Sequence, residues 1–225
     1  PVAGRPLLAW VLDTVHDLGV ERVLTVVGHQ RERVMETFAG AGTEWVIQAE
    51  QRGTGHAVRM AEPALAGFTG TLLVVCGDTP LLRAATLHAL LEGHAARGAA
   101  VTVLSMCVPE PRGYGRILRN ADGGLAAIVE EKDATPEQRR IAEVNSGVYA
   151  FDYPSLARAL ATLTTRNAQG EYYLTDTVAR LAQEGLGAAV VCADEYRELL
   201  GINTVEQLAE AARVREELRA AEEGR

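Results

Sequence analysis

An acidic residue that directly follows an apolar run is the first candidate for chemistry. Residues 71–75 read Thr-Leu-Leu-Val-Val, a β-branched, apolar run that favours a buried strand of a parallel sheet, and Gly77-Asp78 ends it. A carboxylate just beyond the carboxyl end of a central strand is well placed to hold Mg²⁺ against a phosphate. Alternatively, Asp78 is only a turn residue or an N-cap before a helix near Thr86. The stretch by itself leaves both interpretations open.

A pair of amide side chains forms the second candidate. Gln48 and Gln51 follow a short strand, and amides both donate and accept hydrogen bonds, so the pair could read the polar edge of a nucleotide base. Gly53-Thr54-Gly55 then opens a helix, whose free backbone N–H groups suit an anion or a polar carbonyl. The alternative is a polar loop in which Thr54 is the N-cap of the helix.

Three further stretches interrupt the apolar pattern. Tyr114 lies between two glycines, in a loop that could bring backbone against a ligand or simply turn into a strand at 116–119. Glu130 and Lys132 end a later strand, where a solvated charge run is the alternative, although Lys132 is the only lysine of the chain. Asn-Ser-Gly at 145–147 interrupts an apolar strand, which predicts a β-bulge or a ligand contact.

Composition limits the class of protein. The 225 residues are 48% hydrophobic and 23% charged, as in an ordinary globular protein with one large α/β domain, alone or with a short tail. A net charge of -8 without a cluster of basic residues argues against a nucleic-acid-binding surface. The three cysteines are scattered, which predicts free thiols in an intracellular protein. No apolar run has the length of a membrane span, so we expect no membrane partner.

Helical and strand patterns alternate along the chain. We expect helices at residues 5–18, 30–38, 54–62, 84–97, 135–140, 153–163, 175–184 and 204–221. We expect strands at 22–27, 44–48, 71–75, 100–108, 116–119, 125–131, 144–151 and 188–192. Asp122-Gly123-Gly124 is a hairpin signal, so part of the sheet should be antiparallel. The prediction is an α/β fold of three layers, α/β/α, around a mixed, mostly parallel central sheet.

Seven of these stretches resemble one enzyme family, in the order in which that family carries them. They are QAEQRGTGHA, CGDTPLL, RGYGRI, VEEKDAT, EVNSGVY, NAQGEYYLTD and GINT. Together they resemble the N-terminal uridylyltransferase domain of the bacterial bifunctional enzyme that makes UDP-N-acetylglucosamine. The resemblance implies a Rossmann-like nucleotidyltransferase fold and Mg²⁺-dependent transfer of UMP from UTP to N-acetylglucosamine 1-phosphate, with release of pyrophosphate. It also implies a cytoplasmic enzyme of peptidoglycan and lipopolysaccharide precursor synthesis, homotrimeric as the full-length parent.

The resemblance also assigns binding roles to individual residues. The residues implied to bind the nucleotide are Gln48, Gln51, Gly53 and Thr54. The residues implied to bind the N-acetylglucosamine portion are Tyr114, Gly115, Glu130, Asn145, Tyr173 and Thr175.

Few residues are implied to take part in catalysis. Asp78 and Asn203 would share a Mg²⁺ ion that takes phosphate oxygens and waters as its other ligands, and Lys132 would approach the sugar phosphate. The implied reaction is an in-line displacement, in which a sugar phosphate oxygen attacks the α-phosphorus of UTP and pyrophosphate leaves. Positioning and charge neutralisation then suffice, without a side-chain nucleophile.

The chain departs from the family pattern in three respects, the first being that the family's C-terminal β-helix domain has no counterpart in it. The resemblance divides it into a nucleotidyltransferase domain at 1–202 and a linker helix at 203–225, and the family's first strand and glycine-rich phosphate loop have no counterpart in it. We therefore expect these residues alone to be poorly active. Cys76 stands where some family members carry Tyr. The alternative functions are another sugar-1-phosphate nucleotidylyltransferase and a non-catalytic module that binds a nucleotide sugar.

Overall fold

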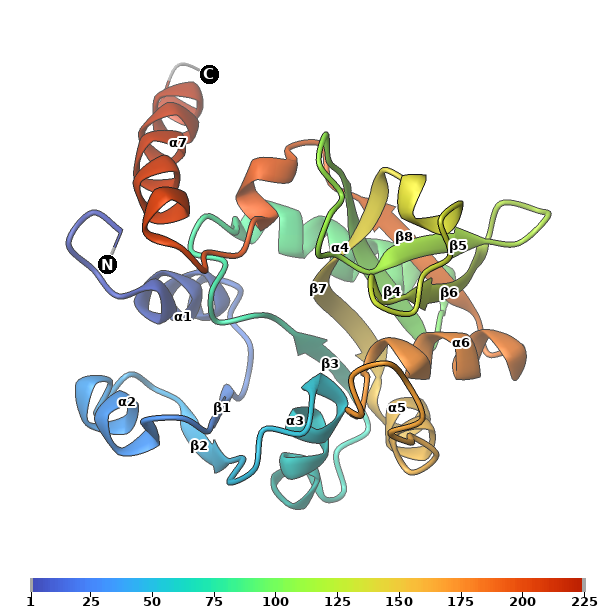
Figure 1. Ribbon diagram of the computed structural model, residues 1–225. Helices are drawn as coiled ribbons and strands as arrows, with labels where there is room; N and C mark the ends of the chain where they lie inside the picture. Colours follow the sequence, from blue (N-terminus) through green and yellow to red (C-terminus); the bar gives the residue numbers. More distant parts are fainter. Residues whose placement is uncertain (1, 224–225) are drawn as a thin grey trace.

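Short strands and helices alternate through the structure, a computed structural model that describes residues 2–223 (Figure 1). The α-helices are α1 (Leu7–Asp17), α2 (Arg31–Thr37), α3 (Thr54–Met60), α4 (Ala84–Arg97), α5 (Tyr153–Leu160), α6 (Thr175–Gln183) and α7 (Val205–Glu223). The strands are β1 (Leu24–Val27), β2 (Glu44–Ile47), β3 (Thr71–Val74), β4 (Val101–Cys107), β5 (Arg116–Arg119), β6 (Leu125–Val129), β7 (Glu143–Asp152) and β8 (Ala188–Cys192). The 3₁₀ helices are η1 (Glu62–Leu65), η2 (Gln138–Arg140) and η3 (Tyr196–Leu199). The predicted elements are present with shifted ends, and the helix expected at 135–140 is only the short η2. η1 and η3 are additions that no sequence pattern indicated.

β7 organises the main sheet. The sheet has six strands. Five of them follow the order β6-β5-β7-β4-β8, and β3 also pairs with β7. The pairings make β3, β4, β5 and β8 point one way and β6 and β7 the other. The sheet is mixed, as predicted, but β7 runs against all the strands that it pairs with. Neighbouring strands are therefore mostly antiparallel, although most strands share one direction.

β1 and β2 form a separate, parallel two-stranded sheet. The expectation of a single central sheet is wrong for these strands, because within residues 2–223 no strand pairing joins them to β3. Side-chain packing connects them instead, since Leu24 and Val46 contact the apolar core on one face of the main sheet. Ile47, at the end of β2, remains 46% exposed.

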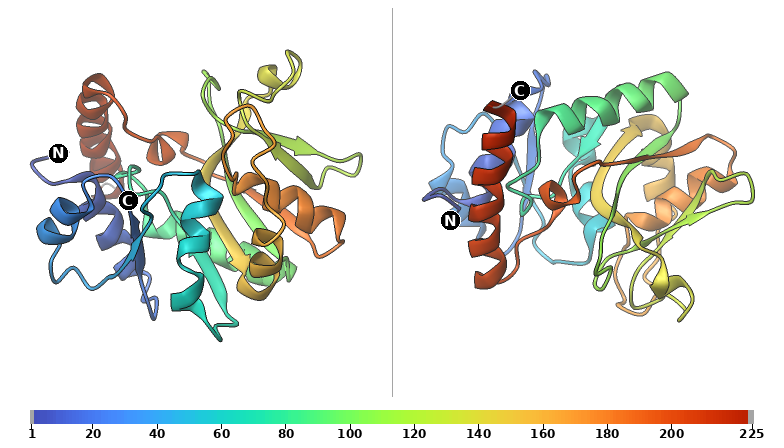
Figure 2. Two further views of the ribbon diagram at one scale, coloured as in Figure 1. Left: turned by 60° about the horizontal axis from the view of Figure 1, so that its bottom comes forward. Right: turned by 90° about the horizontal axis from the view of Figure 1, so that it is seen from above.

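Two apolar cores cover the two faces of the main sheet, so the predicted three layers are confirmed. Alternate residues of a strand point to opposite faces. Tyr149 and Phe151 of β7 enter the core that includes α5 and α6, whereas Val148 and Ala150 enter the core that includes α4. Figure 2 shows α4 and the α5–α6 pair on opposite sides of the sheet. Burial of both faces explains why these strands read as apolar runs.

Two local predictions about the strands are confirmed. β5 and β6 pair antiparallel across the turn at 120–124. The β4–β7 register shifts between Leu104 and Ser105, which is the predicted bulge. Gly147 at this bulge has a φ of +82°, and a Cβ there would lie 2.7 Å from Cys76 Sγ. Only glycine therefore fits this position without strain.

α7 packs against α1. Val214 of α7 is buried in an apolar cluster with Val2. Trp10 of α1 lies between two guanidinium groups, with the Arg5 and Arg215 Cζ atoms 4.1 Å and 3.5 Å from the ring centroid. The helix expected at the carboxyl end of the chain is thus present and attached to the domain. Within residues 2–223, no helix is both long and apolar enough to cross a membrane.

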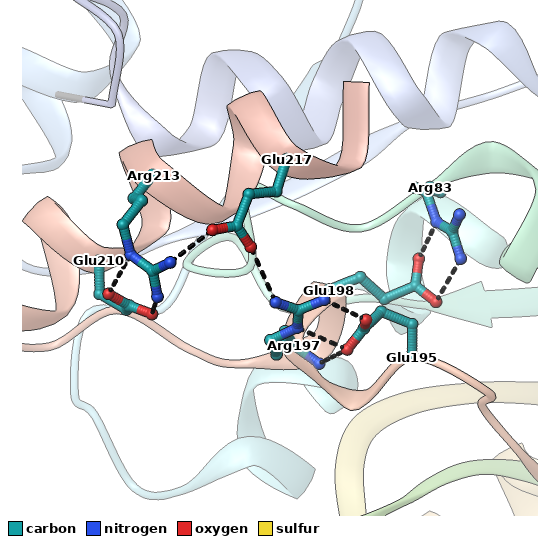
Figure 3. Close-up of polar contacts among 7 residues, drawn as sticks. All are labelled: Arg83, Glu195, Arg197, Glu198, Glu210, Arg213 and Glu217. Atoms are coloured by element: carbon teal, nitrogen blue, oxygen red, sulfur yellow. Dashed lines mark hydrogen bonds and ion pairs between the residues drawn. The ribbon is translucent and has the colours of Figure 1, made fainter. Parts of the chain in front are cut away.

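Charged side chains fix the segment between β8 and α7. Arg197 of η3 donates to Glu217 of α7 (3.0 Å), and Arg83 before α4 donates to Glu198 (2.7 Å), as Figure 3 shows. Glu198 is 1% exposed and also accepts from Thr86 Oγ1 (2.8 Å). A buried carboxylate with such partners anchors η3 on α4.

Candidate functional site

The Asp78 turn, residues 76–78, lies at the carboxyl end of β3. The N-cap of α4 is Arg83, so Asp78 is a turn residue and the N-cap alternative is wrong. Burial raises the pKa of the Asp78 carboxyl, and a hydrogen bond with its own backbone opposes this shift. Within the part of the chain that the structure describes, no basic side chain forms an ion pair with it. The turn therefore presents a partly desolvated carboxylate, which a bound cation would stabilise.

The segment before α7 reaches back to the Asp78 turn. Ile202 N donates to Asp78 O (3.0 Å), and a Cβ on Gly201 would lie 3.1 Å from Asp78 Oδ2. Asn203 follows directly and is exposed, while Gln207 Oε1 accepts from its backbone N–H (2.7 Å). The fold thus brings Asp78 and Asn203, far apart in the sequence, into neighbouring turns.

The Asp78 turn also contacts the bulge of β7. Cys76 Sγ donates to Gly147 O (3.5 Å). Burial, together with the nearby Asp78 carboxylate, raises the pKa of the Cys76 thiol to about 12. Burial and the same carboxylate also raise the pKa of Tyr114. The charge of Asp78 thus acts on both Tyr114 and Cys76, and both side chains stay protonated at neutral pH.

A second group, the Glu130 cluster, consists of Gly115, Glu130, Asn145 and Thr175. Thr175 Oγ1 donates to Glu130 Oε1 (2.9 Å), and Asn145 N donates to Gly115 O (2.8 Å). A Cβ on Gly115 would lie 3.5 Å from Glu130 Oε2 and 2.9 Å from Ile128 Cγ2. Four predicted site residues, from separate parts of the chain, are thus in contact.

Burial dominates the electrostatics of the Glu130 cluster. It raises the pKa of Glu130, the hydrogen bond from Thr175 opposes the shift, and the charge of Asp176 adds to it. Thr175 itself is only 2% exposed. A desolvated carboxylate of this kind gains most from a ligand that donates hydrogen bonds, such as a polyol.

The amide of Asn145 is fixed on both sides. Its Nδ2 donates to Tyr149 Oη (2.6 Å), and its Oδ1 accepts from Gly147 N (3.0 Å). Burial raises the pKa of Tyr149 well above its usual range, so the hydroxyl stays neutral. Tyr149 is not among the residues predicted for the site. Its place four residues after Asn145, in a strand interrupted by polar residues, is the only signal that the sequence contains.

Tyr173 connects to the site through Asp133, another residue that the sequence analysis did not select. Tyr173 Oη donates to Asp133 Oδ2 (3.1 Å), and Ala168 N donates to Asp133 Oδ1 (2.9 Å). Tyr173 is 6% exposed. Lys132 precedes Asp133 in the turn after β6 and is exposed, with no ion pair to any residue in the described range. The structure therefore brings Tyr173 into the site and leaves Lys132 at its rim.

The glutamine loop, residues 48–55, is held by its own amides. Gln48 Nε2 donates to Gly53 O (3.1 Å) and lies 2.9 Å from His56 Nδ1. Gln51 Nε2 donates to Gln48 O (3.2 Å). Gln48 is only 8% exposed. The two predicted base-reading amides are therefore close together and fixed in orientation.

The glutamine loop is docked on the segment that precedes α6. Gly55 N donates to Tyr172 O (2.8 Å), and Leu174 N donates to Thr54 Oγ1 (3.3 Å). Gly53 has a φ of +102°, and a Cβ there would lie 2.6 Å from Tyr172 O, so the approach requires glycine. The same segment leads into α6 and hence into the Glu130 cluster. The glutamine loop and the Glu130 cluster therefore share one wall.

Comparison with known proteins decides the family. The sequence profile of the MobA-like NTP transferase domain matches residues 1–223. The chain belongs to this family. Its α/β fold and its class, nucleotidyltransferase, are therefore as predicted.

The relatives of this NTP transferase domain are longer proteins. It is 49% identical over 215 residues to the "Bifunctional protein GlmU" of Pelobacter propionicus, covering 95% of the chain and 47% of that relative. It is 48% identical over 219 residues to the GlmU protein of Thermobifida fusca, covering 95% of the chain and 45% of that relative. It is 47% identical over 214 residues to the GlmU protein of Geobacillus thermodenitrificans, covering 95% of the chain and 46% of that relative. The chain spans about half the length of these curated relatives.

The oxygen donors of the NTP transferase domain suit Mg²⁺ in one specific way. Asp78 offers a partly desolvated carboxylate, and Asn203 carries an amide in the neighbouring turn. Within residues 2–223, no group of three or more His, Cys, Asp or Glu side chains could hold a metal alone. Two hard donors fit Mg²⁺, because this ion keeps waters and phosphate oxygens in its coordination sphere, and they do not form an all-protein cage.

Proposed function

We propose that this NTP transferase domain transfers UMP from UTP to N-acetylglucosamine 1-phosphate and releases pyrophosphate. The shared wall carries the proposal, because a loop suited to a base is docked beside a cluster suited to a sugar. The Asp78 turn contacts the β7 bulge, which also holds Asn145, so the phosphates would lie between these groups. The similarity to GlmU proteins supports the same assignment.

The uracil ring would lie against the glutamine loop. The amides of Gln48 and Gln51 offer the donor and acceptor groups that complement the imide edge of uracil. Both amides already have a fixed orientation in the loop, so binding would cost little side-chain entropy. Gly53 allows the close backbone approach, and Thr54 lies at the start of α3 beside it.

The N-acetylglucosamine portion would bind at the Glu130 cluster, with Tyr114 and Tyr173 at its edges. Glu130 would accept a hydrogen bond from a sugar hydroxyl, and burial would strengthen that bond. Asn145 is held in place by its neighbours, so it would contribute without rearrangement. Gly115 leaves the space in front of Glu130 open, since a larger residue would approach its carboxylate.

Asp78 and Asn203 would hold Mg²⁺, which when bound offsets the negative charge of the phosphates. The domain's residues would then align a sugar phosphate oxygen with the α-phosphorus of UTP, opposite the bond to the leaving pyrophosphate. Lys132, at the rim of the site, would contact the sugar phosphate and offset part of its charge. No side chain has to act as nucleophile or to transfer a proton, because the phosphate is already ionised.

The length of the relatives suggests how the chain is divided. We propose residues 1–202 as the nucleotidyltransferase domain and 203–225 as a linker that contains α7. The relatives' length, about twice that of the chain, supports this division.

A cytoplasmic, trimeric full-length enzyme that supplies cell-wall precursors would accord with the product UDP-N-acetylglucosamine.

A ligand panel tests the proposal. Calorimetry would compare UDP-N-acetylglucosamine with UDP-glucose and with ADP-glucose, each with Mg²⁺. We expect ADP-glucose to bind roughly 10²-fold more weakly than UDP-glucose, because amides that pair with uracil are left unpaired by adenine. UDP-glucose should bind about 10-fold more weakly through loss of the acetamido contacts. Equal affinity for all three would overturn the proposal.

An activity assay with matched variants completes the test. Pyrophosphate release by the full-length enzyme that carries this domain would be followed with UTP, CTP or ATP and with N-acetylglucosamine 1-phosphate or glucose 1-phosphate. Gln51→Ala should reduce the preference for UTP, whereas Gln183→Ala, at the exposed end of α6, should not change it. An unchanged base preference in the Gln51→Ala variant would show that this loop does not read the base.

A further inference from the structure

Two cysteines that are far apart in the sequence end adjacent strands. Cys107 is the last residue of β4 and Cys192 the last residue of β8. Their Sγ atoms lie 4.0 Å apart, and both residues are exposed. None of the functions proposed above uses either thiol.

The register of the sheet explains the proximity. β4 and β8 are parallel, and Cys192 lies opposite Ser105. Residues two apart in a strand point to the same face, so Cys107 lies on the same face as Ser105 and is a diagonal neighbour of Cys192. The pairing continues one residue beyond the strand, since Ala193 N donates to Ser105 O (2.9 Å). The two thiols are therefore held together by backbone hydrogen bonds and do not meet by chance motion.

We propose that Cys107 and Cys192 form a dithiol site that small disulfides, such as oxidised glutathione, convert reversibly to an intramolecular disulfide. The sulfur atoms have to approach from 4.0 Å to about 2.05 Å. Both residues are at the exposed ends of their strands, where rotation of the side chains and a small backbone shift can supply this movement.

The chemistry is a two-step thiol–disulfide exchange. The thiolate of one cysteine attacks the small disulfide, forms a mixed disulfide and releases one small thiol. The second thiolate attacks the protein sulfur of the mixed disulfide, forms the Cys107–Cys192 bond and releases the second small thiol. The protein loses two hydrogen atoms in total, and the small disulfide is reduced by two electrons.

The surroundings of the pair determine how its reactivity depends on pH. Burial raises the pKa of Cys107, the neighbouring Cys192 thiol and the Glu143 carboxylate raise it further, and Arg119 opposes the shift. Glu143 is paired with Cys107 across the β4–β7 ladder and is bound by Arg119 (2.8 Å). Because the thiolate is the nucleophile, oxidation should become faster as the pH rises above neutrality.

Cys76 provides an internal control. Its Sγ donates to Gly147 O (3.5 Å) at the β7 bulge, so this thiol has a partner of its own and is not positioned to join the pair. A Cys76→Ser variant should therefore form the Cys107–Cys192 bond as the wild type does. Cys107→Ser and Cys192→Ser should each stop at a mixed disulfide with one glutathione on the remaining partner.

Peptide mapping tests the proposal. The reduced protein is incubated with oxidised glutathione, remaining thiols are alkylated, and the peptides are analysed by mass spectrometry. We expect a crosslinked peptide pair that contains Cys107 and Cys192, and its loss on treatment with dithiothreitol. Separate glutathione adducts on both cysteines, a crosslink between two copies of the protein, or two unmodified thiols would each overturn the proposal.

Thermal unfolding gives a second measurement. The bond would close a loop between residues 85 positions apart, which constrains the unfolded chain. The oxidised wild type should unfold at a Tm roughly 5–10 °C higher than the reduced wild type. The Cys107→Ser variant should show no such difference. A lower Tm after oxidation would show that the strand ends do not accommodate the bond, and would contradict the site as proposed.

Discussion

The Glu130 cluster and the Asp78 turn hold their carboxylates in different ways. Glu130 accepts a hydrogen bond from the buried Thr175 hydroxyl, and the cluster joins the residue before β5, the residue after β6, the strand β7 and the helix α6. Asp78 is fixed mainly through its backbone, by the hydrogen bond from Ile202 N. In the first region the functional groups also support the fold, whereas in the second the carboxylate is available for a ligand. Substitutions should therefore lower stability in the first region, whereas in the second they should affect function without loss of stability.

The largest effect is expected at Asp78. Asp78→Asn keeps the shape and removes the charge that would hold Mg²⁺. We expect pyrophosphate release by the enzyme that carries this domain to fall by roughly 10²–10³-fold, as for loss of one transition-state contact. Stability should not fall, because burial already disfavours the ionised form in the folded state.

Asp17→Asn is the matched control for this prediction. Asp17 is the exposed last residue of α1 and is not among the proposed site residues. Kinetics and thermal unfolding of both variants should separate a functional carboxylate from an ordinary surface one. If Asp78→Asn unfolds more readily than the control with unchanged turnover, the contrast between the two regions does not hold.

The next effect concerns the wall that the glutamine loop shares with the Glu130 cluster. Gly53→Ala would place a Cβ 2.6 Å from Tyr172 O, at a backbone φ of +102° that other residues rarely adopt. We expect the free energy of unfolding to fall by about 3 kcal/mol or more, because both strain and a backbone clash act. Urea denaturation measures the change.

Gly67→Ala separates the two causes. Gly67 also has a positive φ, +79°, but a Cβ there would meet no atom within 4 Å. This variant should lose only about 1–2 kcal/mol, the cost of the left-handed backbone conformation. Equal losses in the two variants would mean that the docking of the glutamine loop contributes nothing beyond local strain.

The sequence predicted the elements of this fold well because their patterns are local. α4 and β5 match the predicted ranges 84–97 and 116–119, since apolar periodicity and flanking turn residues define both. The bulge near Gly147 was also predictable, because polar residues within an apolar strand need a structural reason. The direction of β7 was not, since β7 pairs with partners far away in the sequence and no local pattern encodes that choice.

The candidate site was predictable as a set of residues but not as a set of contacts. The hydrogen bond from Asn145 to Tyr149 and that from Tyr173 to Asp133 join side chains that no spacing pattern links. The proximity of Cys107 and Cys192 depends likewise on the β4–β8 register. Such pairs follow from tertiary packing, which sequence periodicity does not contain.

A smaller effect is expected at the hydroxyl that holds Glu130. Thr175→Val keeps the side-chain volume and removes the donor to a buried carboxylate, which should cost about 1–3 kcal/mol of stability. Thr177→Val is the control on the same helix. Thr177 Oγ1 donates to Leu174 O (2.6 Å), but that carbonyl also accepts from Thr177 N (3.1 Å).

Because the Leu174 carbonyl keeps a partner, Thr177→Val should cost only about 1 kcal/mol. Chemical denaturation of both variants gives the comparison. A larger loss for Thr177→Val would show that packing around α6, rather than the Glu130 carboxylate, sets the stability of this region.

The smallest effect is a dependence of stability on pH, which has opposite signs at two adjacent residues. Burial raises the pKa of Glu130 in the folded state. The contribution of protonated Glu130 to the free energy of unfolding is therefore complete below the ordinary carboxyl pKa of about 4.3. It is lost as the pH rises through the raised pKa of the folded state. Burial also tends to raise the pKa of Glu131, but the hydrogen bond and the charge of Arg116 outweigh it, so the pKa is lowered. Arg116 Nη2 lies 2.6 Å from Glu131 Oε2. The contribution of ionised Glu131 is present above the ordinary pKa and is lost as the pH falls.

Glu130→Gln and Glu131→Gln each remove one titrating carboxyl group. The contributions of all other titrating groups to stability cancel when a variant is compared with the wild type. Between about pH 4 and pH 7, the wild type should lose stability relative to Glu130→Gln as the pH rises. Relative to Glu131→Gln, it should instead lose stability as the pH falls toward acid. Urea denaturation from about pH 3 to pH 7 measures both slopes, because the Glu131 slope lies below the ordinary carboxyl pKa of about 4.3. Slopes of the same sign would mean that burial does not dominate the pKa of Glu130. Glu130 would then behave as an ordinary solvated carboxylate.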